Sequence, residues 1–265
     1  MRSILRKIKG GLKQLYFFFH QAYFSAKATK VECNICGFKA DRLKSDNWHP
    51  YSICPRCEST VRQRLLWATL QHHTQLNLDT IITRKSVLHF APEKVLRSRL
   101  KSASAVYETA DYFTEGYDYP DIDHCIDISS MGGVKNETYD CVIACDVLEH
   151  VPDHKKALRE IHRILKSPGY CILTVPQKDN LKVTYEDPSI TDPKERKLKF
   201  GQSDHVRIYG EDFPQMIKEA GFEVAVVDEN YFKKETGDKN VLFPPVLSTH
   251  PLATNYRKIF FGKKS

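Results

Sequence analysis

Residues 139–176 read YDCVIACDVLEHVPDHKKALREIHRILKSPGYCILTVP, and this stretch decides the fold. Residues 141–145 form an apolar run of strand length, as expected for a parallel strand that is covered on both faces. Asp153 can cap the helix that follows, in which apolar residues recur at helical spacing. The Pro-Gly pair at 168–169 ends this helix, and residues 170–175 read as the next strand. The stretch therefore predicts a strand–helix–strand unit of a parallel sheet.

Three polar side chains follow the first of these strands directly: Asp146, Glu149 and His150. Open α/β sheets bind their ligands just outside the carboxyl ends of the strands. This edge of the sheet is therefore the first place to expect a binding site.

The order of these features resembles the second half of class I S-adenosylmethionine-dependent methyltransferases of the type 11-like group. The matching features, in chain order, are Tyr-Asp at 139–140, an apolar strand, VLEHV at 147–151, RILK at 163–166 and Pro-Gly at 168–169. The resemblance extends in weaker form from about residue 86 to residue 261. It implies an α/β fold with a Rossmann-like methyltransferase sheet and helices on both faces, an S-adenosylmethionine cofactor and methyl transfer.

Composition sets outer limits on this interpretation. The chain has 265 residues, of which 41% are hydrophobic and 28% charged, enough for one α/β core and a small module. Its net charge of +7 permits a phosphate-bearing or membrane-surface partner without requiring one. We find no apolar run long enough to span a bilayer and no signal-peptide pattern, and the cysteine usage suits a reducing interior. We expect a cytoplasmic protein, with a peripheral position at a membrane as the alternative.

Residues 1–30 carry seven basic side chains and no acidic one. Their apolar residues fall on one helical face, which predicts a basic amphipathic N-terminal segment, although the Gly pair at 10–11 weakens the helix. Such a segment can meet an anionic membrane surface, bind RNA or pack on its own protein. All three alternatives stay open, as does the oligomeric state.

Four cysteines stand in two CxxC pairs separated by seventeen residues: Cys33, Cys36, Cys54 and Cys57. This spacing is typical of a four-thiolate zinc site with a closed shell, so residues 31–58 are predicted to form a zinc ribbon around structural Zn²⁺. The alternatives are unrelated buried cysteines or a redox pair, and His49 is a possible competing ligand. Residues 59–85 then read as a linking helix and a connection, and residues 86–265 as the methyltransferase domain.

The segment VLHFAPE at 87–93 occupies the place of the first strand and its cofactor turn. The family usually has an acid and then glycines there, whereas this chain has His89 and Ala91. A His-Phe-Ala-Pro-Glu variant resembles methyltransferases that carry a cysteine-rich N-terminal ribbon. The resemblance implies cofactor contacts from His89, Ala91 and Glu93, with Glu93 at the ammonium group. Alternatively, Glu93 is an acid favoured by a helix N-terminus.

Acids at the ends of the next two strands complete the expected cofactor site. Asp111 ends residues 105–111 about twenty residues beyond the first turn, where an acid can reach ribose hydroxyls. A solvated turn aspartate is the alternative for Asp111. By resemblance, Asp127 accepts from the adenine amino group and Ile128 packs on the ring, while Asp146 and Glu149 shape the pocket.

In-line alignment of acceptor and methyl group can lower the barrier by roughly 7–11 kcal/mol, and a general base can add roughly 10²–10⁴-fold in rate. The candidates for catalysis are His205, Asp146 and His150, with His205 preferred as the base and Arg207 as the partner of an anionic acceptor. Alternatively, Asp204 caps a turn and His205 braces it.

The chain closes with two predicted strands, 222–227 and 256–261, which the family pairs antiparallel at one sheet edge. The loop between them is a candidate for the acceptor rim. We expect methyl transfer to a small-molecule or glycan-type acceptor. An RNA methyltransferase, with the ribbon as recognition module, and a non-catalytic binding protein remain as alternatives.

Overall fold

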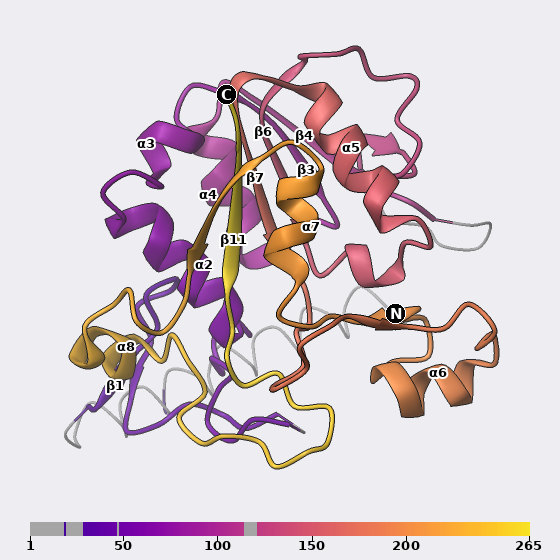
Figure 1. The fold of residues 1–265 in the computed structure, drawn as a ribbon. Helices are drawn as coiled ribbons and strands as arrows, with labels where there is room; N and C mark the ends of the chain where they lie inside the picture. The colour runs from indigo at the N-terminus through magenta and orange to yellow at the C-terminus, as the bar shows by residue number, and fades with distance from the viewer. Residues whose placement is uncertain (1–18, 20–28, 47, 114–120) are drawn as a thin grey trace, which may run out of the picture.

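A computed structural model of the chain describes residue 19 and residues 29–46, 48–113 and 121–265. Its centre is a seven-stranded sheet, made of β3 (Ser86–Phe90), β4 (Val106–Asp111), β5 (His124–Cys125), β6 (Tyr139–Cys145), β7 (Leu165–Thr174), β10 (Glu223–Val227) and β11 (Ile259–Lys264). The strand order is β10-β11-β7-β6-β3-β4-β5 (Figure 1). Strands β3 to β7 of this sheet pair in parallel, whereas β11 runs antiparallel to both β7 and β10. The predicted α/β fold class and the antiparallel edge pair are confirmed.

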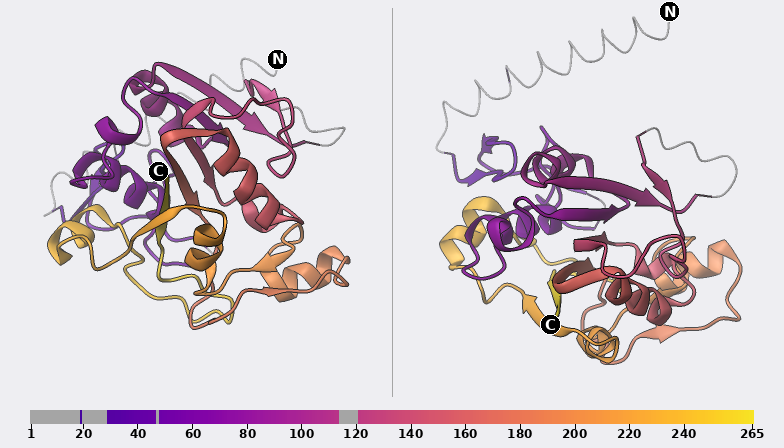
Figure 2. Two further views of the ribbon diagram at one scale, coloured as in Figure 1. Left: turned by 45° about the horizontal axis from the view of Figure 1, so that its top comes forward. Right: turned by 90° about the horizontal axis from the view of Figure 1, so that it is seen from above.

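Helices cover both faces of the sheet (Figures 1 and 2). One face carries α2 (Val61–His72), α3 (Leu78–Ile81) and α4 (Lys94–Ala103), and the other carries α5 (His154–Ile164) and α7 (Phe213–Glu219). Strand β6 explains why two cores form. Its odd-numbered residues 141, 143 and 145 belong to the first core and residues 142 and 144 to the second, because side chains alternate along a strand.

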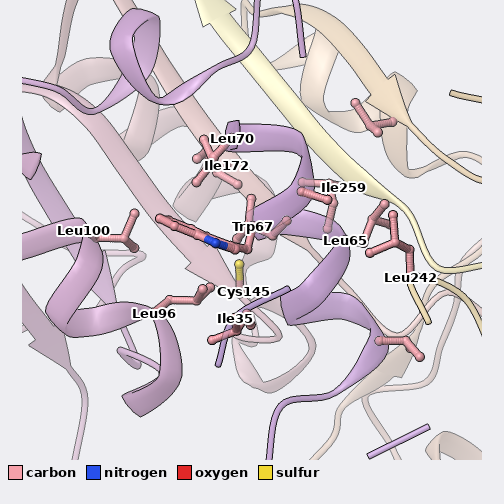
Figure 3. Close-up of a cluster of buried hydrophobic side chains, with 14 of the residues drawn as sticks. Ile35, Leu65, Trp67, Leu70, Leu96, Leu100, Cys145, Ile172, Leu242 and Ile259 are labelled. Carbon is pink, nitrogen blue, oxygen red and sulfur yellow. The ribbon is translucent and has the colours of Figure 1, made fainter. Parts of the chain in front are cut away.

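The core on the α2 side includes residues of the cysteine-rich segment. Figure 3 shows Ile35 of that segment beside Trp67 of α2, Leu96 of α4 and Cys145 of β6. Burying each large apolar side chain contributes about 1.5–3 kcal/mol. The segment therefore packs on the sheet domain through shared apolar residues. The predicted domain boundaries after residues 30, 58 and 85 stay predictions.

The cysteine-rich segment contains an antiparallel pair, β1 (Val31–Glu32) with β2 (Lys39–Ala40). Arg64 of α2, which is fully buried, holds the cysteine-rich segment in place. Its guanidinium donates to Ser52 O (2.6 Å), Ser59 O (2.6 Å) and Val241 O (3.0 Å), and Val241 follows helix α8 (Lys234–Asn240). One side chain thus links the ribbon, the linking helix and the C-terminal region.

The polar segment that follows β7 forms a small lobe of its own. It contains α6 (Pro193–Phe200) and a two-stranded ladder of β8 (Tyr185–Glu186) with β9 (Arg207–Ile208). Ile190, Phe200 and Ile208 form its apolar centre. In Figure 1 this lobe and the ribbon both lie at the end of the sheet that is farther from the labelled C-terminus. Because β11 runs antiparallel to β7, this end is the carboxyl end of the parallel strands.

The predicted stop of the central helix at Pro168-Gly169 is wrong. Helix α5 ends at Ile164, and β7 already begins at Leu165, whose backbone is extended. The ammonium group of Lys264 donates to His162 O (3.1 Å) and Leu165 O (2.7 Å), so a cation from β11 satisfies carbonyls at the end of the helix. The Pro-Gly pair lies inside β7 instead.

The predicted basic N-terminal segment lies outside the described residues, apart from Phe19 and residues 29 and 30. Within the part of the chain that is described, no helix combines the length and the apolar character needed to cross a membrane.

Candidate active site

Two residues leave the ends of parallel strands with left-handed backbone. Ala91 follows β3 with φ +46°, and Asp146 follows β6 with φ +53°. Residues with side chains rarely adopt such angles, and strain of this kind concentrates at functional sites. The Ala91 N–H donates to Ala110 O (2.9 Å), and the Asp146 N–H donates to Thr174 O (3.0 Å). Both turns are therefore fixed at the edge of the sheet where the cofactor site is predicted.

An arginine from the linking helix joins the two acids of this edge. Arg62 pairs through Nε with Asp146 Oδ2 at 2.9 Å, and through Nη1 with Glu93 Oε1. Burial alone would raise the pKa of Glu93, but Arg62 and His89 together lower it to about 2. Burial likewise opposes the Arg62 charge, yet Asp146 and Glu93 hold the pKa of Arg62 above its usual value. Arg62 and Glu93 are therefore both charged.

His89 supports this cluster from beneath. It is fully buried in β3, where Nδ1 lies 2.8 Å from the Tyr107 hydroxyl and Nε2 lies 3.6 Å from Glu93 Oε2. A side chain in this position orients Glu93 and is screened from solvent. The predicted cofactor contact from His89 is thus indirect in the geometry of the described residues.

The predicted ribose and adenine acids lie at adjacent strand ends. Asp111 ends β4 beside Cys125 of β5, and Asp127 follows two residues later. Asp111 is half-buried, and burial raises the pKa of its carboxyl, while the Tyr112 N–H and His150 oppose the rise. Asp127 accepts from the Ser129 N–H (2.7 Å) and hydroxyl (2.8 Å). Asp111 thus keeps more acceptor capacity than Asp127.

Ile128, the predicted adenine neighbour, is only 3% exposed and belongs to the core on the α5 side. Asp127 instead lines a cavity of about 660 Å³, together with Glu108, His124 and Tyr139. The structure therefore brings together Glu93, Asp146 and Arg62, and leaves Asp127 and Ile128 outside that cluster. Their predicted adenine contacts stay predictions.

Two further candidates face each other beyond β6. Glu149 lies in the short 3₁₀ helix η1 (Leu148–His150), and its Oε1 is 4.0 Å from Nε2 of His205. Nδ1 of His205 lies 3.1 Å from the carbonyl of Phe200, so it must donate, which leaves a lone pair on Nε2. Burial and then His150 lower the pKa of His205, whereas burial and Asp146 raise the pKa of Glu149 well above its ordinary value.

Glu149, His150 and His205 place one ligand atom each within 4.8 Å of one another, so the group has the donor types of a metal site. Ligand atoms around tetrahedral zinc lie only about 3.3 Å apart, given bonds of about 2.0–2.1 Å. His150 also has a competing partner, because its Nδ1 lies 3.3 Å from Asp204 Oδ2. The 4.0 Å between Glu149 Oε1 and His205 Nε2 is wider than tetrahedral zinc requires, and it is also too long for a hydrogen bond.

Arg207 does not serve as the partner of an anionic acceptor, and that prediction is wrong. The residue is buried, and its guanidinium donates to Leu148 O (2.8 Å) and Pro152 O (2.7 Å). Its Nε pairs with Glu186 at 2.9 Å. These contacts occupy the guanidinium in bracing η1 against the α6 lobe.

Beside His205 lies a cavity of about 210 Å³. Its wall comes from segments far apart in the sequence: Asp46, Trp48 and His49 of the ribbon, Pro176 after β7, five residues of the lobe between 200 and 208, and Leu252, Thr254 and Arg257 before β11. Leu252 and Thr254 belong to the loop that was expected at the acceptor rim, a role that stays a prediction, and Arg257 follows that loop. The ribbon is therefore part of the cavity wall as well as of the core.

The four cysteines of the CxxC pairs converge as predicted. Sγ of Cys33 lies 3.7 Å from Sγ of Cys57, and Sγ of Cys36 lies 3.6 Å from Sγ of Cys54. Sulfurs bound at about 2.3 Å to a tetrahedral zinc ion would lie about 3.8 Å apart. His49 is not part of this group; it lines the cavity near Arg257 instead.

Sequence reasoning missed Arg62 and Arg257. Both lie outside the motifs that carry the resemblance, Arg62 on the linking helix and Arg257 just before the last strand. Charged residues at such positions are ordinarily solvated, and nothing in the local pattern distinguishes these two from the other thirty-eight basic residues of the forty. The available signal was topological, because both segments return to the carboxyl edge of the sheet.

Comparisons with known proteins agree with this geometry. A family model described as a methyltransferase domain matches residues 51–227, more than half of the chain. Rat (Rattus norvegicus) arsenite methyltransferase is 29% identical over 117 residues, 42% of this chain and 30% of that protein. An uncharacterised protein of Methanocaldococcus jannaschii, MJ0638, is 51% identical over 47 residues, 18% of this chain and 20% of that protein. The chain thus matches under a third of the length of these relatives.

Among solved structures, an S-adenosylmethionine-dependent methyltransferase from Mesorhizobium loti is 12% identical, with a TM-score of 0.51 over 78% of this chain and all of the other. This likeness concerns the fold alone. Together with the family model and the seven-stranded sheet, it establishes that the chain belongs to the methyltransferase domain family and has the class I, Rossmann-like fold.

Proposed function

We propose that the protein transfers a methyl group from S-adenosylmethionine to a small-molecule or glycan-type acceptor. The observation that carries the proposal is the charged cluster of Arg62, Glu93 and Asp146 at the carboxyl ends of β3 and β6. Membership of the methyltransferase family supports the reaction class, and the small volume of the cavity beside His205, about 210 Å³, supports an acceptor smaller than RNA.

The residues present fit the cofactor. Glu93 Oε2 is buried with no hydrogen-bond partner, which suits an incoming ammonium group. Arg62 carries the donors that suit a carboxylate, and the Asp111 carboxylate, which accepts from the Tyr112 N–H at Oδ1, keeps acceptor capacity for a ribose diol. Asp127 remains the candidate for the adenine amino group. When bound, S-adenosylmethionine supplies a methyl group that is already activated on a sulfonium.

The protein's own contribution would then be positioning and proton removal. Nε2 of His205 holds a lone pair, because its Nδ1 donates to a carbonyl, and it can accept the proton of an acceptor hydroxyl. Asp146 is held by Arg62 and Thr174, whose hydroxyl donates to Oδ1 at 2.9 Å, so we assign it to shaping the cofactor pocket. His150 pairs with Asp204 and has the weaker case for catalysis.

For the ribbon we propose a structural Zn²⁺ held by all four cysteine thiolates. A shell of four protein ligands leaves no open position for substrate or water, so the ion would stabilise the fold and take no part in chemistry. The sulfur separations near 3.7 Å support this assignment.

The test is calorimetric titration of zinc-loaded protein with S-adenosylmethionine, beside the variant Asp111→Ala. We expect micromolar binding by the wild type and a loss of at least tenfold in the variant, because the diol loses its acceptor. Glu235→Ala, an exposed substitution on α8, should bind as the wild type does. Absence of binding by well-folded wild-type protein would refute the proposal and favour a non-catalytic binding protein.

A further inference from the structure

The 210 Å³ cavity collects three nitrogen-bearing side chains from parts of the chain far apart in sequence: His49, His205 and Arg257. Each has a buried nitrogen with no hydrogen-bond partner, namely Nε2 of each histidine and Nε of the arginine. His49 is 4% exposed and His205 is 2% exposed. Buried polar atoms are ordinarily paired, so three unpaired nitrogens around one cavity indicate a missing ligand.

Arg257 supplies the positive charge of this group. Across the residues described, its guanidinium has no carboxylate within 4.0 Å and no hydrogen bond of its own, although burial lowers its pKa. The acids that influence it, Asp146, Asp46 and Glu149, all remain beyond ion-pair distance. Arg257 is only partly exposed, and its buried Nε has no hydrogen-bond partner, so an anion that enters the cavity would pair with a cation that is already partly withdrawn from water.

The nearby acid of the ribbon is not free to become that partner. Asp46 accepts from the backbone N–H of Trp48 at 2.7 Å and from the Ser52 hydroxyl at 3.3 Å, as well as from the His49 N–H. These bonds hold the ribbon loop in the conformation that places His49 and Trp48 in the cavity wall. The positive charge of Arg257 therefore stays uncompensated on the cavity side.

The two histidines add neutral hydrogen-bonding groups. Burial, followed by Arg257, lowers the pKa of His49, and burial lowers that of His205. The cavity thus presents the Arg257 cation and two imidazoles, and the hydrogen-bonded carboxylate of Asp46 is the acid in its wall. At about 210 Å³ it is smaller than the roughly 300–1,000 Å³ of pockets for drug-sized ligands, so it suits one small unit of an acceptor.

We propose that this cavity is the acceptor subsite and that it binds a carboxylate or phosphate group of the acceptor through Arg257 and His49. The same acceptor then presents a hydroxyl to Nε2 of His205. Substrates of this chemistry are sugar acids, sugar phosphates and small hydroxy acids. The role of the cavity as an acceptor subsite rests on the proposed methyl transfer. The binding of an anion in the cavity can be tested independently of that reaction.

The experiment uses zinc-loaded full-length protein saturated with S-adenosylhomocysteine, titrated calorimetrically with inorganic phosphate and, separately, with glucuronate. We expect saturable binding of at least one of the two anions, weakened at least tenfold in Arg257→Met and at least threefold in His49→Gln. Arg159→Met, an exposed substitution on α5, serves as the matched control and should leave the affinity unchanged. Melting temperatures of all variants identify any that fail to fold.

A parallel titration with S-adenosylmethionine separates the two sources of a carboxylate. If Arg257→Met leaves cofactor affinity within twofold of wild type while anion affinity falls, the anion belongs to the acceptor. If cofactor affinity falls and anion affinity does not, Arg257 binds the methionine carboxylate and the acceptor proposal is refuted. Failure of the wild type to bind either anion also refutes it, whatever the result for the cofactor.

Discussion

Ala91 is a residue-scale feature with a measurable consequence. Its φ of +46° places an L-residue in the left-handed region, which costs about 1–2 kcal/mol. Glycine adopts this conformation freely but loses about 0.5–1 kcal/mol of stability through the entropy of the unfolded chain. The backbone strain that glycine would relieve at this position is therefore slightly larger than the entropic cost that glycine would add.

We therefore expect Ala91→Gly to raise the free energy of unfolding by about 0.5–1 kcal/mol in urea denaturation. Ala105→Gly is the matched control, since Ala105 is exposed and has no positive φ, and it should lower stability. If Ala91→Gly instead lowers stability as much as the control does, the strain at Ala91 is not real.

The protonation state of His205 can be measured without knowing the acceptor. Burial and His150 lower its pKa below the ordinary value of 6.5, and its Nδ1 faces the Phe200 carbonyl. Nitrogen-15 NMR of labelled histidines should show one ring, absent from His205→Gln, that stays neutral to below pH 6.5 as the Nδ1–H tautomer. A ring protonated at pH 7, or one carrying its proton on Nε2, would remove the case for His205 as a base at neutral pH.

At the scale of elements, helix α5 is tied to the lobe by its first residue. His154 is 3% exposed, and its Nδ1 lies 2.7 Å from the hydroxyl of Tyr209, which follows β9. Burial and then Arg207 lower the pKa of His154 to about 4. The folded protein therefore holds this histidine neutral where the unfolded chain would protonate it.

The sign of the pH effect follows from that difference. Above pH 6.5 both states are neutral, and the contribution of His154 to stability is fully present. As the pH falls from 6.5 to about 4, only the unfolded state takes up a proton, so stability should decline over this window. Urea denaturation between pH 7 and 4 should show a shallower decline for His154→Gln than for wild type. Equal slopes would contradict the assignment.

Elements could be predicted where one local signal dominates. The strand 141–145 and the capped helix after Asp153 follow from the local apolar pattern, the antiparallel pairing of the last two strands follows from the family resemblance, and the structure confirms all three. The end of α5 could not be predicted, because a lysine from β11, a hundred residues away, satisfies its carbonyls while the Pro-Gly pair joins the sheet. The α6 lobe could not be predicted, since its core has just a few apolar residues.

For the whole molecule, the ribbon connects the proposed zinc site to the cavity that we propose for the acceptor. Residues 33–57 bring the four cysteines together, and the loop within them supplies His49 and Trp48 to the cavity. Arg64 and shared apolar contacts hold this segment on the sheet domain. Loss of the metal should therefore disturb the cavity without unfolding the sheet directly.

We expect Cys54→Ser, or treatment with a strong chelator, to release about one zinc per chain and to lower the melting temperature, because structural zinc contributes folding energy. Metal analysis and calorimetry provide the measurement, and Cys125→Ser, at an exposed cysteine outside the cluster, is the control. Retention of one zinc by Cys54→Ser would show that the four thiolates are not its ligands.

The sequence by itself determined the sheet, its two helical layers, the cysteine cluster and the positions of Glu93, Asp111 and Asp146 at strand ends. These follow from short-range patterns of period two and period 3.6, and from fixed ligand spacing. Only the tertiary structure decided which charges meet. Arg62 reaches two acids more than thirty and eighty residues away, Arg207 is consumed as a brace, and Arg257 is left unpaired beside His49. Ion pairing depends on distances of a few ångströms between remote segments, and no local pattern encodes those distances.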